Sequence, residues 1–192
     1  MRYLLLLSSL FFFRINTVAQ SCTFEYPLFQ TVTYQASIDV LDKHLSGLLI
    51  FSKVEEDTTR CVFMNEMGIT FYSMSFTKEQ YFYHYVMPSL NKKGVKIALA
   101  KDMGMILMQG IFKQTISTNA TSQVFKLKRK GYVRYTFENC KKINKIENYG
   151  KKNVVSIVPF YQSKSDMPDS LSVQHHAFDF SIRLKQLYDT TK

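Results

Sequence analysis

Strict alternation of apolar and polar side chains constrains this chain more than any other feature of its sequence. In the stretch TVTYQASIDV, the even positions from Val32 to Val40 are apolar and the odd positions from Thr31 to Asp39 are polar. Successive side chains of a strand point to opposite faces of a sheet, so this stretch predicts a strand with one dry side and one wet side. Comparable runs follow at 47–54, 60–65, 69–76 and 80–87. The first half of the chain therefore predicts a five-stranded antiparallel meander.

The alternation returns after residue 123. VFKLKRKGYVRYTFE (124–138) predicts a hairpin that turns at Arg129–Gly131, and KINKIENYG and NVVSIVPFY predict two further strands. The last apolar stretch, LSVQHHAFDFSIRLKQL (171–187), has its apolar residues first at odd and then at even positions. We interpret this stretch as one closing strand with a β-bulge near His175–His176.

One helix is expected between the two sets of strands. Pro88 ends the fifth strand, and Asn91 can cap a helix that continues to about Met108. Gly94 and Gly104 weaken it, so we expect the helix to pack on the sheet. Four apolar residues at helical spacing form its predicted buried stripe: Val95, Leu99, Met103 and Ile106.

About ten antiparallel strands with one helix are compatible with a sandwich, a closed barrel or an open half-barrel. A closed barrel of this size fills its own interior, whereas a strongly curved open sheet needs a cover on its concave face. The sequence therefore predicts a mainly β fold with one mid-chain helix, in which a curved antiparallel open half-barrel of about ten strands is capped by the helix.

The N-terminus has the pattern of a secretory signal peptide, predicted to span residues 1–21. Arg2 precedes the apolar run Leu4–Phe13, which is too short to span a bilayer, and small residues stand at Ala19 and Ser21. Cleavage before Cys22 would leave one domain, 22–192. We expect an exported protein of the periplasm or outer-membrane periphery of a Gram-negative bacterium.

The three cysteines leave an odd count in an exported chain. Cys22 would be exposed by cleavage, or would carry a lipid if the leader is that of a bacterial lipoprotein. In either case Cys61 and Cys140 could form a disulfide, and the sequence leaves that pairing open.

Positive charge is concentrated in one segment. Two of the ten net positive charges belong to Arg2 and Arg14 of the leader, which leaves +8 for the mature chain. The segment 126–152 contains ten Lys or Arg and two Glu, also a net +8. It is either a contact surface for an anionic membrane or other anionic partner, or a solvated outer face of the sheet. The contact residues we expect for the first alternative are Lys128, Lys130, Lys141 and Lys142.

Methionine is concentrated elsewhere, since seven of the nine methionines lie between positions 64 and 108. Met is not favoured in strands, but its flexible side chain packs around irregular apolar shapes. These residues either fill gaps in a core or line an apolar surface that accepts a flexible ligand.

The motif search points away from catalysis. The sequence contains no phosphate-binding glycine loop, nucleophile elbow, zinc-protease helix or paired-cysteine metal motif. We therefore expect no enzyme activity, cofactor or metal site. A hydrolase built from dispersed residues such as His84, His175 and Asp179 remains an alternative, which requires a pocket that gathers them.

The order of motifs resembles the LolA/LolB-type periplasmic lipoprotein carriers and receptors, and more nearly their shorter relatives in Bacteroidetes. The resemblance is carried by SGLLIFSK, RCVFMNEMGITFYSMSF, KDMGMILM, GYVRYTFE and MPDSLSVQHHAFDFSIRL. It implies an open barrel whose concave face binds lipid tails, and it makes Asn65–Gly68 the nearest match to the family's protruding hydrophobic loop.

These observations together predict a non-enzymatic monomer that binds lipid or an acylated protein and does not bind nucleic acid. An envelope protein that binds anionic partners through the basic strand face is the alternative. The apolar cavity of the first hypothesis would be lined by Tyr34, Met64, Met74, Met103, Ile106, Tyr135, Phe178 and Phe180.

Overall fold

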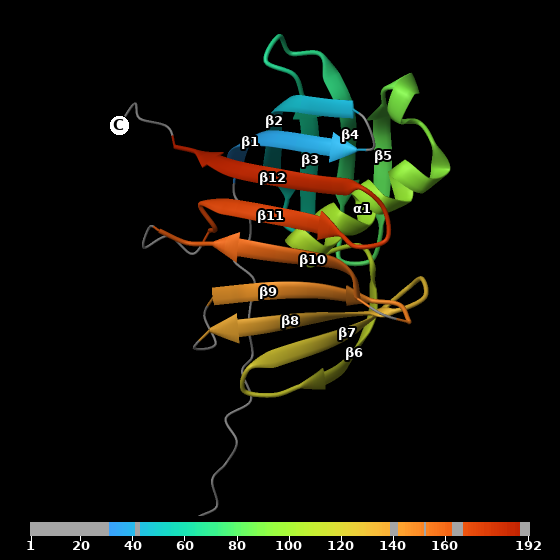
Figure 1. The fold of residues 1–192 in the computed structure, drawn as a ribbon, viewed down its shortest axis with the longest axis vertical. Coiled ribbons are helices and arrows are strands. Elements are labelled where there is room, and N and C mark those ends of the chain that lie inside the picture. Colours follow the sequence, from blue (N-terminus) through green and yellow to red (C-terminus); the bar gives the residue numbers. More distant parts are fainter. Residues whose placement is uncertain (1–30, 41–42, 139–141, 152, 163–166, 189–192) are drawn as a thin grey trace, which may run out of the picture.

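The computed structural model describes residues 31–40, 43–138, 142–151, 153–162 and 167–188. They form one continuous antiparallel sheet of twelve strands and one α-helix (Figure 1). The first five strands are β1 (Thr31–Val40), β2 (Lys43–Glu55), β3 (Thr58–Met64), β4 (Thr70–Phe76) and β5 (Tyr81–Val86). The 3-10 turn Pro88–Leu90 and the helix α1 (Lys93–Leu107) follow. The remaining strands are β6 (Phe112–Thr118), β7 (Ser122–Leu127), β8 (Tyr132–Glu138), β9 (Lys142–Tyr149), β10 (Asn153–Phe160), β11 (Ser170–His175) and β12 (Phe180–Leu187).

The strand order is β5-β4-β3-β2-β1-β12-β11-β10-β9-β8-β7-β6, so two meanders join in the middle of the sheet. The join is the antiparallel pair of β1 and β12, in which Ala36 lies opposite Leu184 and Ile38 opposite Ile182. Strands β5 and β6 are the two edges, and α1 connects them. Figure 1 shows the sheet bending strongly, with β3–β5 running at a steep angle to β8–β12 and α1 on the concave side. The expected mainly β fold, a curved open sheet with one helix, is confirmed.

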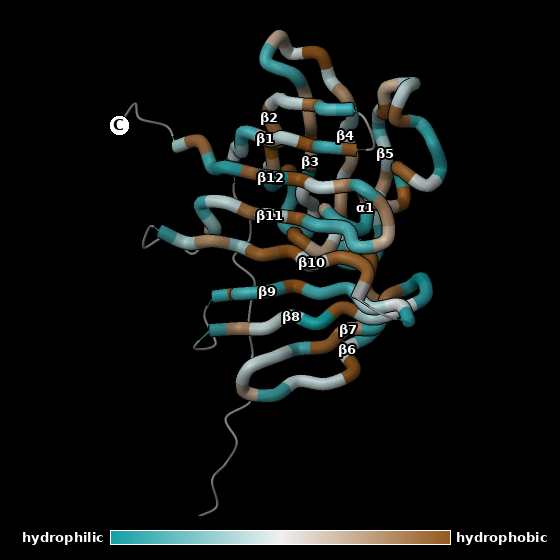
Figure 2. Tube along the Cα trace, in the orientation of Figure 1, coloured by the Kyte–Doolittle hydropathy of each residue, from teal (hydrophilic) through white to brown (hydrophobic). Residues whose placement is uncertain are grey.

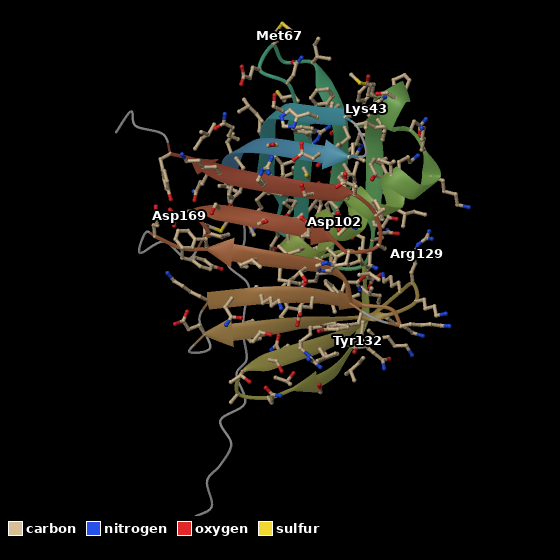
Figure 3. All side chains as sticks on the ribbon, in the orientation of Figure 1. Lys43, Met67, Asp102, Arg129, Tyr132 and Asp169 are labelled. Atoms are coloured by element: carbon tan, nitrogen blue, oxygen red, sulfur yellow. The ribbon has the colours of Figure 1, made fainter. Side chains whose placement is uncertain are left out.

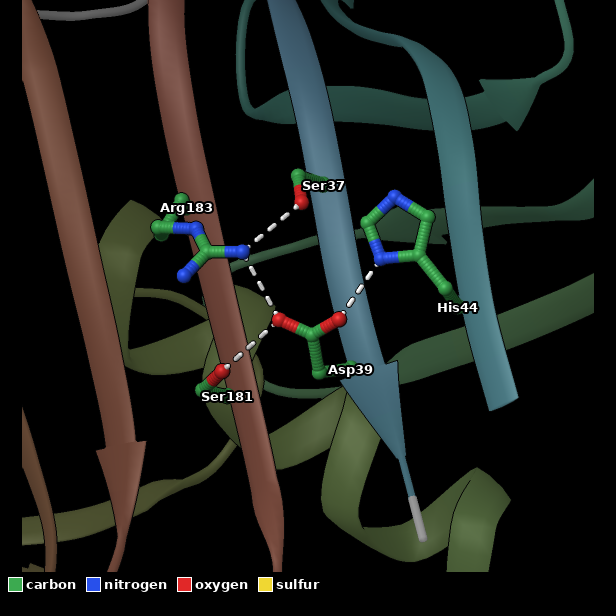
Figure 4. Close-up of polar contacts among 5 residues, drawn as sticks. All are labelled: Ser37, Asp39, His44, Ser181 and Arg183. Carbon is green, nitrogen blue, oxygen red and sulfur yellow. Dashed lines mark hydrogen bonds and ion pairs between the residues drawn. The ribbon is translucent and has the colours of Figure 1, made fainter. Parts of the chain in front are cut away.

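The predicted faces of β1 are also confirmed. Val32, Tyr34, Ala36 and Ile38 are buried on the concave side, and hydropathy alternates along the neighbouring strands as well (Figure 2). The opposite face carries polar groups that bridge three strands (Figure 4).

The centre of this outer polar group is Asp39 on β1. Its two carboxylate oxygens lie 2.6 Å from His44 Nδ1 on β2 and 2.8 Å from Arg183 Nη2 on β12. The hydrogen bond from His44, assisted by the Arg183 charge, lowers the pKa of the Asp39 carboxyl. Such exposed pairs contribute little to stability, but they show that the sheet turns this face to water.

Two strands differ from the expectation of about ten. The edge strand β6 was not predicted, because its residues 113–118 are exposed on both faces and therefore show no apolar alternation. The predicted single closing strand with a bulge is wrong, since β11 and β12 are separate strands that pair with each other. A short turn, residues 176–179, resets the phase of the alternation between them.

The start of the helix and the set of residues that it buries both differ from the prediction. Lys92, not Asn91, precedes its first turn, and no side chain caps it. Asn91 instead accepts a hydrogen bond from Lys96 Nζ at its Oδ1 (3.2 Å). Leu99, Met103 and Ile106 of the predicted stripe are buried, while Val95 is half-buried. From residue 102 to 107 every residue is buried, because the C-terminal half of α1 lies deep within the curve of the sheet.

Cys61 lies in the middle of β3 as a free, fully buried thiol, so the disulfide with Cys140 that the sequence left open is not formed. Burial raises the pKa of the Cys61 thiol far above its ordinary value. A protonated thiol of this kind packs as a small apolar side chain. Cys140 itself lies outside the described residues.

The close approach of β2 to the end of β3 gives a test of the fold. A Cβ atom at Gly47 would collide with the Met64 carbonyl oxygen, whereas a Cβ at Gly94 in α1 would meet no atom within 4 Å. We expect Gly47→Ala to lower the free energy of unfolding by about 1–3 kcal/mol, the usual cost of overpacking. Gly94→Ala should leave it unchanged or raise it by at most about 1 kcal/mol, because Ala favours helix. Urea unfolding of the two variants measures both effects, and equal stabilities would contradict the register.

Candidate functional site

The helix α1 is held against the concave face by hydrogen bonds to both halves of the sheet. Tyr83 on β5 donates its hydroxyl to the Lys96 carbonyl oxygen at 2.6 Å. Tyr135 on β8 donates its hydroxyl to the Met105 carbonyl oxygen at 2.8 Å. Burial raises the pKa of both phenols, which therefore stay protonated as donors. One tyrosine fixes the N-terminal half of the helix and the other its C-terminal half.

A buried ionisable pair makes a third connection. His175 Nε2 at the end of β11 lies 2.8 Å from Asp102 Oδ2, and both side chains are almost completely buried. Burial raises the pKa of the Asp102 carboxyl, an effect that the hydrogen bond from His175 and the nearby charges partly oppose. Asp102 Oδ1 has no hydrogen-bond partner in the part of the chain that the structure describes. This carboxyl is therefore a costly group that a single histidine compensates.

An apolar cavity of about 440 Å³ lies beside the N-terminal half of α1. Its walls are the end of β1, the start of β2, Phe63 on β3, Tyr72 on β4, the first turns of the helix, the start of β10 and the turn between β11 and β12. The apolar lining residues are Ile38, Val40, Leu45, Phe63, Leu90, Val95, Ile97, Ala98, Leu99, Val154, Val155, Ala177, Phe178 and Phe180. Volume and composition are those of a small-molecule site, which is concave, mostly apolar and carries few polar groups.

Four side chains with polar atoms line this cavity: Tyr72, Lys101, Asn148 and His175. Lys101 Nζ donates to Asn148 Oδ1 at 2.5 Å, and Asn148 Nδ2 donates to the Tyr132 carbonyl oxygen at 3.0 Å. His175 is hydrogen-bonded to Asp102, the residue next to Lys101 in the helix. Burial lowers the pKa of the Lys101 ammonium, although the Asp102 charge opposes the shift. The cavity thus has one polar side, where α1 crosses β9 and β11.

A second hollow of about 340 Å³ lies next to the first. Both are lined by Ile97 and Lys101, so these two side chains form the boundary between them. Its other walls are the β4–β5 turn at Glu79–Tyr81, the β7–β8 turn at Lys128–Arg129, and the residues Gly110, Ile111 and Leu127. The two turns meet here, because Lys128 donates its ammonium to the Glu79 carbonyl oxygen and its backbone N–H to the Ile111 carbonyl oxygen.

Two of the eight residues predicted to bind lipid line the cavity. Phe178 is 46% exposed and Phe180 is buried, and their rings stack in parallel with centroids 5.8 Å apart. Both rings also contact the His175 ring.

The other predicted lining residues do not contribute to the cavity wall. Met74, Met103 and Ile106 are fully buried core residues, since the C-terminal half of α1 fills this part of the concave face with its own side chains. The buried Tyr34 donates its hydroxyl to the Pro168 carbonyl oxygen at 3.0 Å. Tyr135 donates its hydroxyl to the Met105 carbonyl oxygen of α1, as described above. Met64 is half-buried at the end of β3.

The three predicted basic contact residues that the structure describes lie at two ends of the sheet. Lys128 and Lys130 are exposed in the β7–β8 turn, at the end where Figure 3 labels Arg129 and Tyr132. Lys142 begins β9 opposite Glu138, at the other end of these strands, with its ammonium 4.8 Å from the Tyr161 ring centroid. Lys141 and Cys22 lie outside the described residues. The basic segment 126–152 is therefore divided between two ends of the sheet, because successive turns of an antiparallel meander lie at opposite ends of its strands.

Two lysines that the sequence analysis did not single out lie at the same end of the sheet as the β7–β8 turn. Lys93 and Lys96 of α1 line one shallow hollow together with Arg129. Their spacing of three residues on a helix was the available signal, since such residues share a face. Their proximity to Arg129 depends on the tertiary fold. The polar network of Lys101 and Asn148 was also missed, for the same reason.

The described residues offer little support for other chemistry. They contain no cluster of three or more His, Cys, Asp or Glu side chains that could hold a metal ion. His84 pairs with Ser75 and His175 with Asp102, so the histidines named for a dispersed hydrolase have separate partners. Within the same ranges, no helix has the length and apolar character needed to cross a membrane.

The buried Asp102 gives a pH-dependent prediction. Its raised pKa means that the native state still binds a proton at pH values where the unfolded chain, with a pKa of about 3.9, has lost it. The stability from this group is complete below the unfolded pKa and is lost as the pH rises through the folded value. Asp102→Asn removes this loss, so the stability of the variant relative to the native protein should increase as the pH rises above about 4.

Urea unfolding of both proteins at a series of pH values measures that difference. Asp39→Asn is the matched control, because the Asp39 pKa is lowered and its removal should give a slope of opposite sign. A difference between native protein and Asp102→Asn that does not change with pH would contradict the burial of a titrating carboxyl.

The comparisons with known proteins support the fold and add no activity. No protein-family model matches the chain, and no curated protein matches it. Among solved structures it is similar to a DUF1329 family protein from Desulfovibrio piger ATCC 29098, with a TM-score of 0.51 and 10% sequence identity over 85% of this chain and 87% of that chain. At this identity the likeness is one of fold.

Proposed function

We propose that this chain is an exported, non-enzymatic binding protein that holds an acyl chain in the apolar cavity beside α1. The observation that carries the proposal is the cavity itself, about 440 Å³ of space lined mostly by aliphatic and aromatic side chains between a helix and an open sheet. Burying one methylene group contributes about 0.8 kcal/mol, so such a lining favours an alkyl chain strongly. The ligand would be a lipid or the acyl group of an acylated protein, bound by a monomer.

The volume indicates how much ligand the cavity can hold. One water molecule takes about 30 Å³ in the liquid, and a methylene group takes a similar volume, so the cavity has room for roughly fifteen such groups. That is about one acyl chain. A ligand with several chains would leave part of its apolar surface in water.

The turn between β3 and β4 is consistent with delivery at a membrane. Met67 is 83% exposed and Ile69 51% exposed at this turn, where Figure 3 labels Met67 at the extremity of the molecule. Asn65 stabilises the turn by accepting a hydrogen bond from the Ile69 N–H at its Oδ1 (2.8 Å). The position corresponds to the loop that the LolA/LolB resemblance singles out, and we propose that its apolar side chains contact lipid.

A second candidate function rests on the basic end of the sheet. Lys93, Lys96, Lys128, Arg129 and Lys130 lie on α1 and the β7–β8 turn, and exposed cations gathered in this way attract anionic partners. An envelope protein that uses this surface alone would bind anionic vesicles in a salt-dependent way and would not bind an acyl chain. The two functions are compatible if the surface docks the protein on an anionic membrane.

Filling the cavity tests the proposed function. Ala98 lies on α1 and lines the cavity, so Ala98→Trp places an indole in the space that the acyl chain would take. We expect the affinity for a fluorescent fatty acid to fall at least about tenfold, the equivalent of roughly two methylene groups excluded. Fluorescence titration measures the affinity, and urea unfolding should show a smaller relative change in stability.

Val158→Trp is the matched control, because Val158 is an exposed residue of β10 that does not line the cavity. It should bind the probe as the native protein does. Equal affinities of all three proteins would place the acyl chain elsewhere, and the absence of any binding by the native protein would overturn the proposed function.

A further inference from the structure

The cavity and the second hollow together form an amphipathic site. The first is apolar, the second is bordered by the β7–β8 turn, and Ile97 and Lys101 line both. Three cationic side chains line the second hollow, Lys101, Lys128 and Arg129, against one carboxylate, Glu79. A ligand whose alkyl chain lies in the apolar cavity would therefore place its head group in the positively charged second hollow.

From this juxtaposition we propose that the ligand is a single-chain amphiphile with an anionic head group, which binds between α1 and the β7–β8 turn through Lys101, Lys128 and Arg129. The inference rests on the proposed function, since the acyl chain of the same molecule occupies the apolar cavity. The shared chemistry is a carboxylate or phosphate oxygen that accepts hydrogen bonds from ammonium and guanidinium groups.

Lys101 gives the strongest argument for an anionic ligand. Its ammonium is partly buried, and the contact that the structure gives it is to the neutral amide oxygen of Asn148. The neighbouring carboxylate of Asp102 is oriented to His175, so no ion pair to Lys101 forms within the described ranges. A partly desolvated cation without a directly contacting carboxylate is unfavourable, and an anionic head group would supply that contact.

The β7–β8 turn supplies the other two cations. The Lys128 ammonium binds the Glu79 carbonyl oxygen, which holds this side chain at the rim of the hollow. Arg129 is exposed at the same rim, and the described residues offer it no ion pair. Its guanidinium can bind a phosphate or carboxylate through two parallel hydrogen bonds. The hollow thus presents donors from a helix on one side and a turn on the other.

Three probes with the same alkyl chain separate the head group from the tail: hexadecanoate, hexadecyl phosphate and hexadecanol. Displacement of a fluorescent fatty acid from the full mature chain gives their relative affinities. We expect both anions to bind at least about tenfold more tightly than the alcohol, as for the loss of one charge-assisted hydrogen bond. The stronger of the two anions would identify the source of the head group as a free fatty acid or a phosphate-bearing lipid.

Two variants test the named residues. Lys101→Met keeps the approximate length of the side chain and removes its charge, and Arg129→Gln removes the charge of an exposed side chain. Each should reduce the preference for the anions over hexadecanol, and that ratio of affinities is the readout because Lys101 also lines the apolar cavity. Lys185→Gln is the control for net charge, since Lys185 is exposed on β12 and does not line either hollow.

The outcomes distinguish this inference from the function on which it rests. If hexadecanol binds as tightly as the two anions, and neither variant changes that ratio, the head-group site is wrong while the acyl cavity stands. If no probe binds the native protein, the proposed function fails and the head-group site fails with it. If Lys185→Gln lowers the preference for anions over hexadecanol as much as Arg129→Gln does, the preference depends only on the net charge of the protein. That result would also overturn the head-group site.

Discussion

The contact between α1 and the concave face of the sheet is the constraint on which the rest of this structure depends. Twelve strands that curve without closing leave one large apolar face, and the helix is the element that crosses it. Hydrogen bonds from Tyr83 on β5 and Tyr135 on β8 hold the two halves of the helix to opposite halves of the sheet. Because α1 also connects the edge strands β5 and β6, the same segment that covers the face fixes the ends of the sheet.

The cavity arises from the unequal size of the residues along this helix. In its C-terminal half, large side chains such as Met103 and Ile106 fill the curve of the sheet. In its N-terminal half, the small residues Gly94 and Ala98 line the cavity and leave space, while Lys101 marks the change between the two. A hollow of this size with a mostly apolar lining and few polar groups is typical of a small-molecule site.

Much of the architecture could be predicted from the sequence, and the exceptions have physical causes. The alternation in β1 identified its buried face because one side packs on the core and the other meets water. The edge strand β6 escaped detection, since with both faces exposed it has no alternation to detect. The change of phase near His175 was visible, but a change of phase alone does not distinguish a bulge from a hairpin turn.

The candidate site was predicted less well than the fold. The two aromatic residues next to the β11–β12 turn, Phe178 and Phe180, line the cavity, whereas the methionines that suggested a flexible apolar surface mostly lie in the core. Residue type indicates that a side chain is apolar, but it does not indicate whether that side chain lies in the core or lines the cavity. The polar side of the cavity, where Lys101 meets Asn148, joins residues 47 positions apart, and no local pattern carries that information.

Native mass spectrometry of the mature protein, after incubation with a mixture of single-chain and two-chain lipids, tests the central claim most directly. If the cavity holds one acyl chain, the protein should retain one single-chain lipid, with anionic species enriched over neutral species, and Ala98→Trp should lose the adduct. A protein that retains no lipid, or that prefers two-chain lipids and keeps them in Ala98→Trp, would contradict this account.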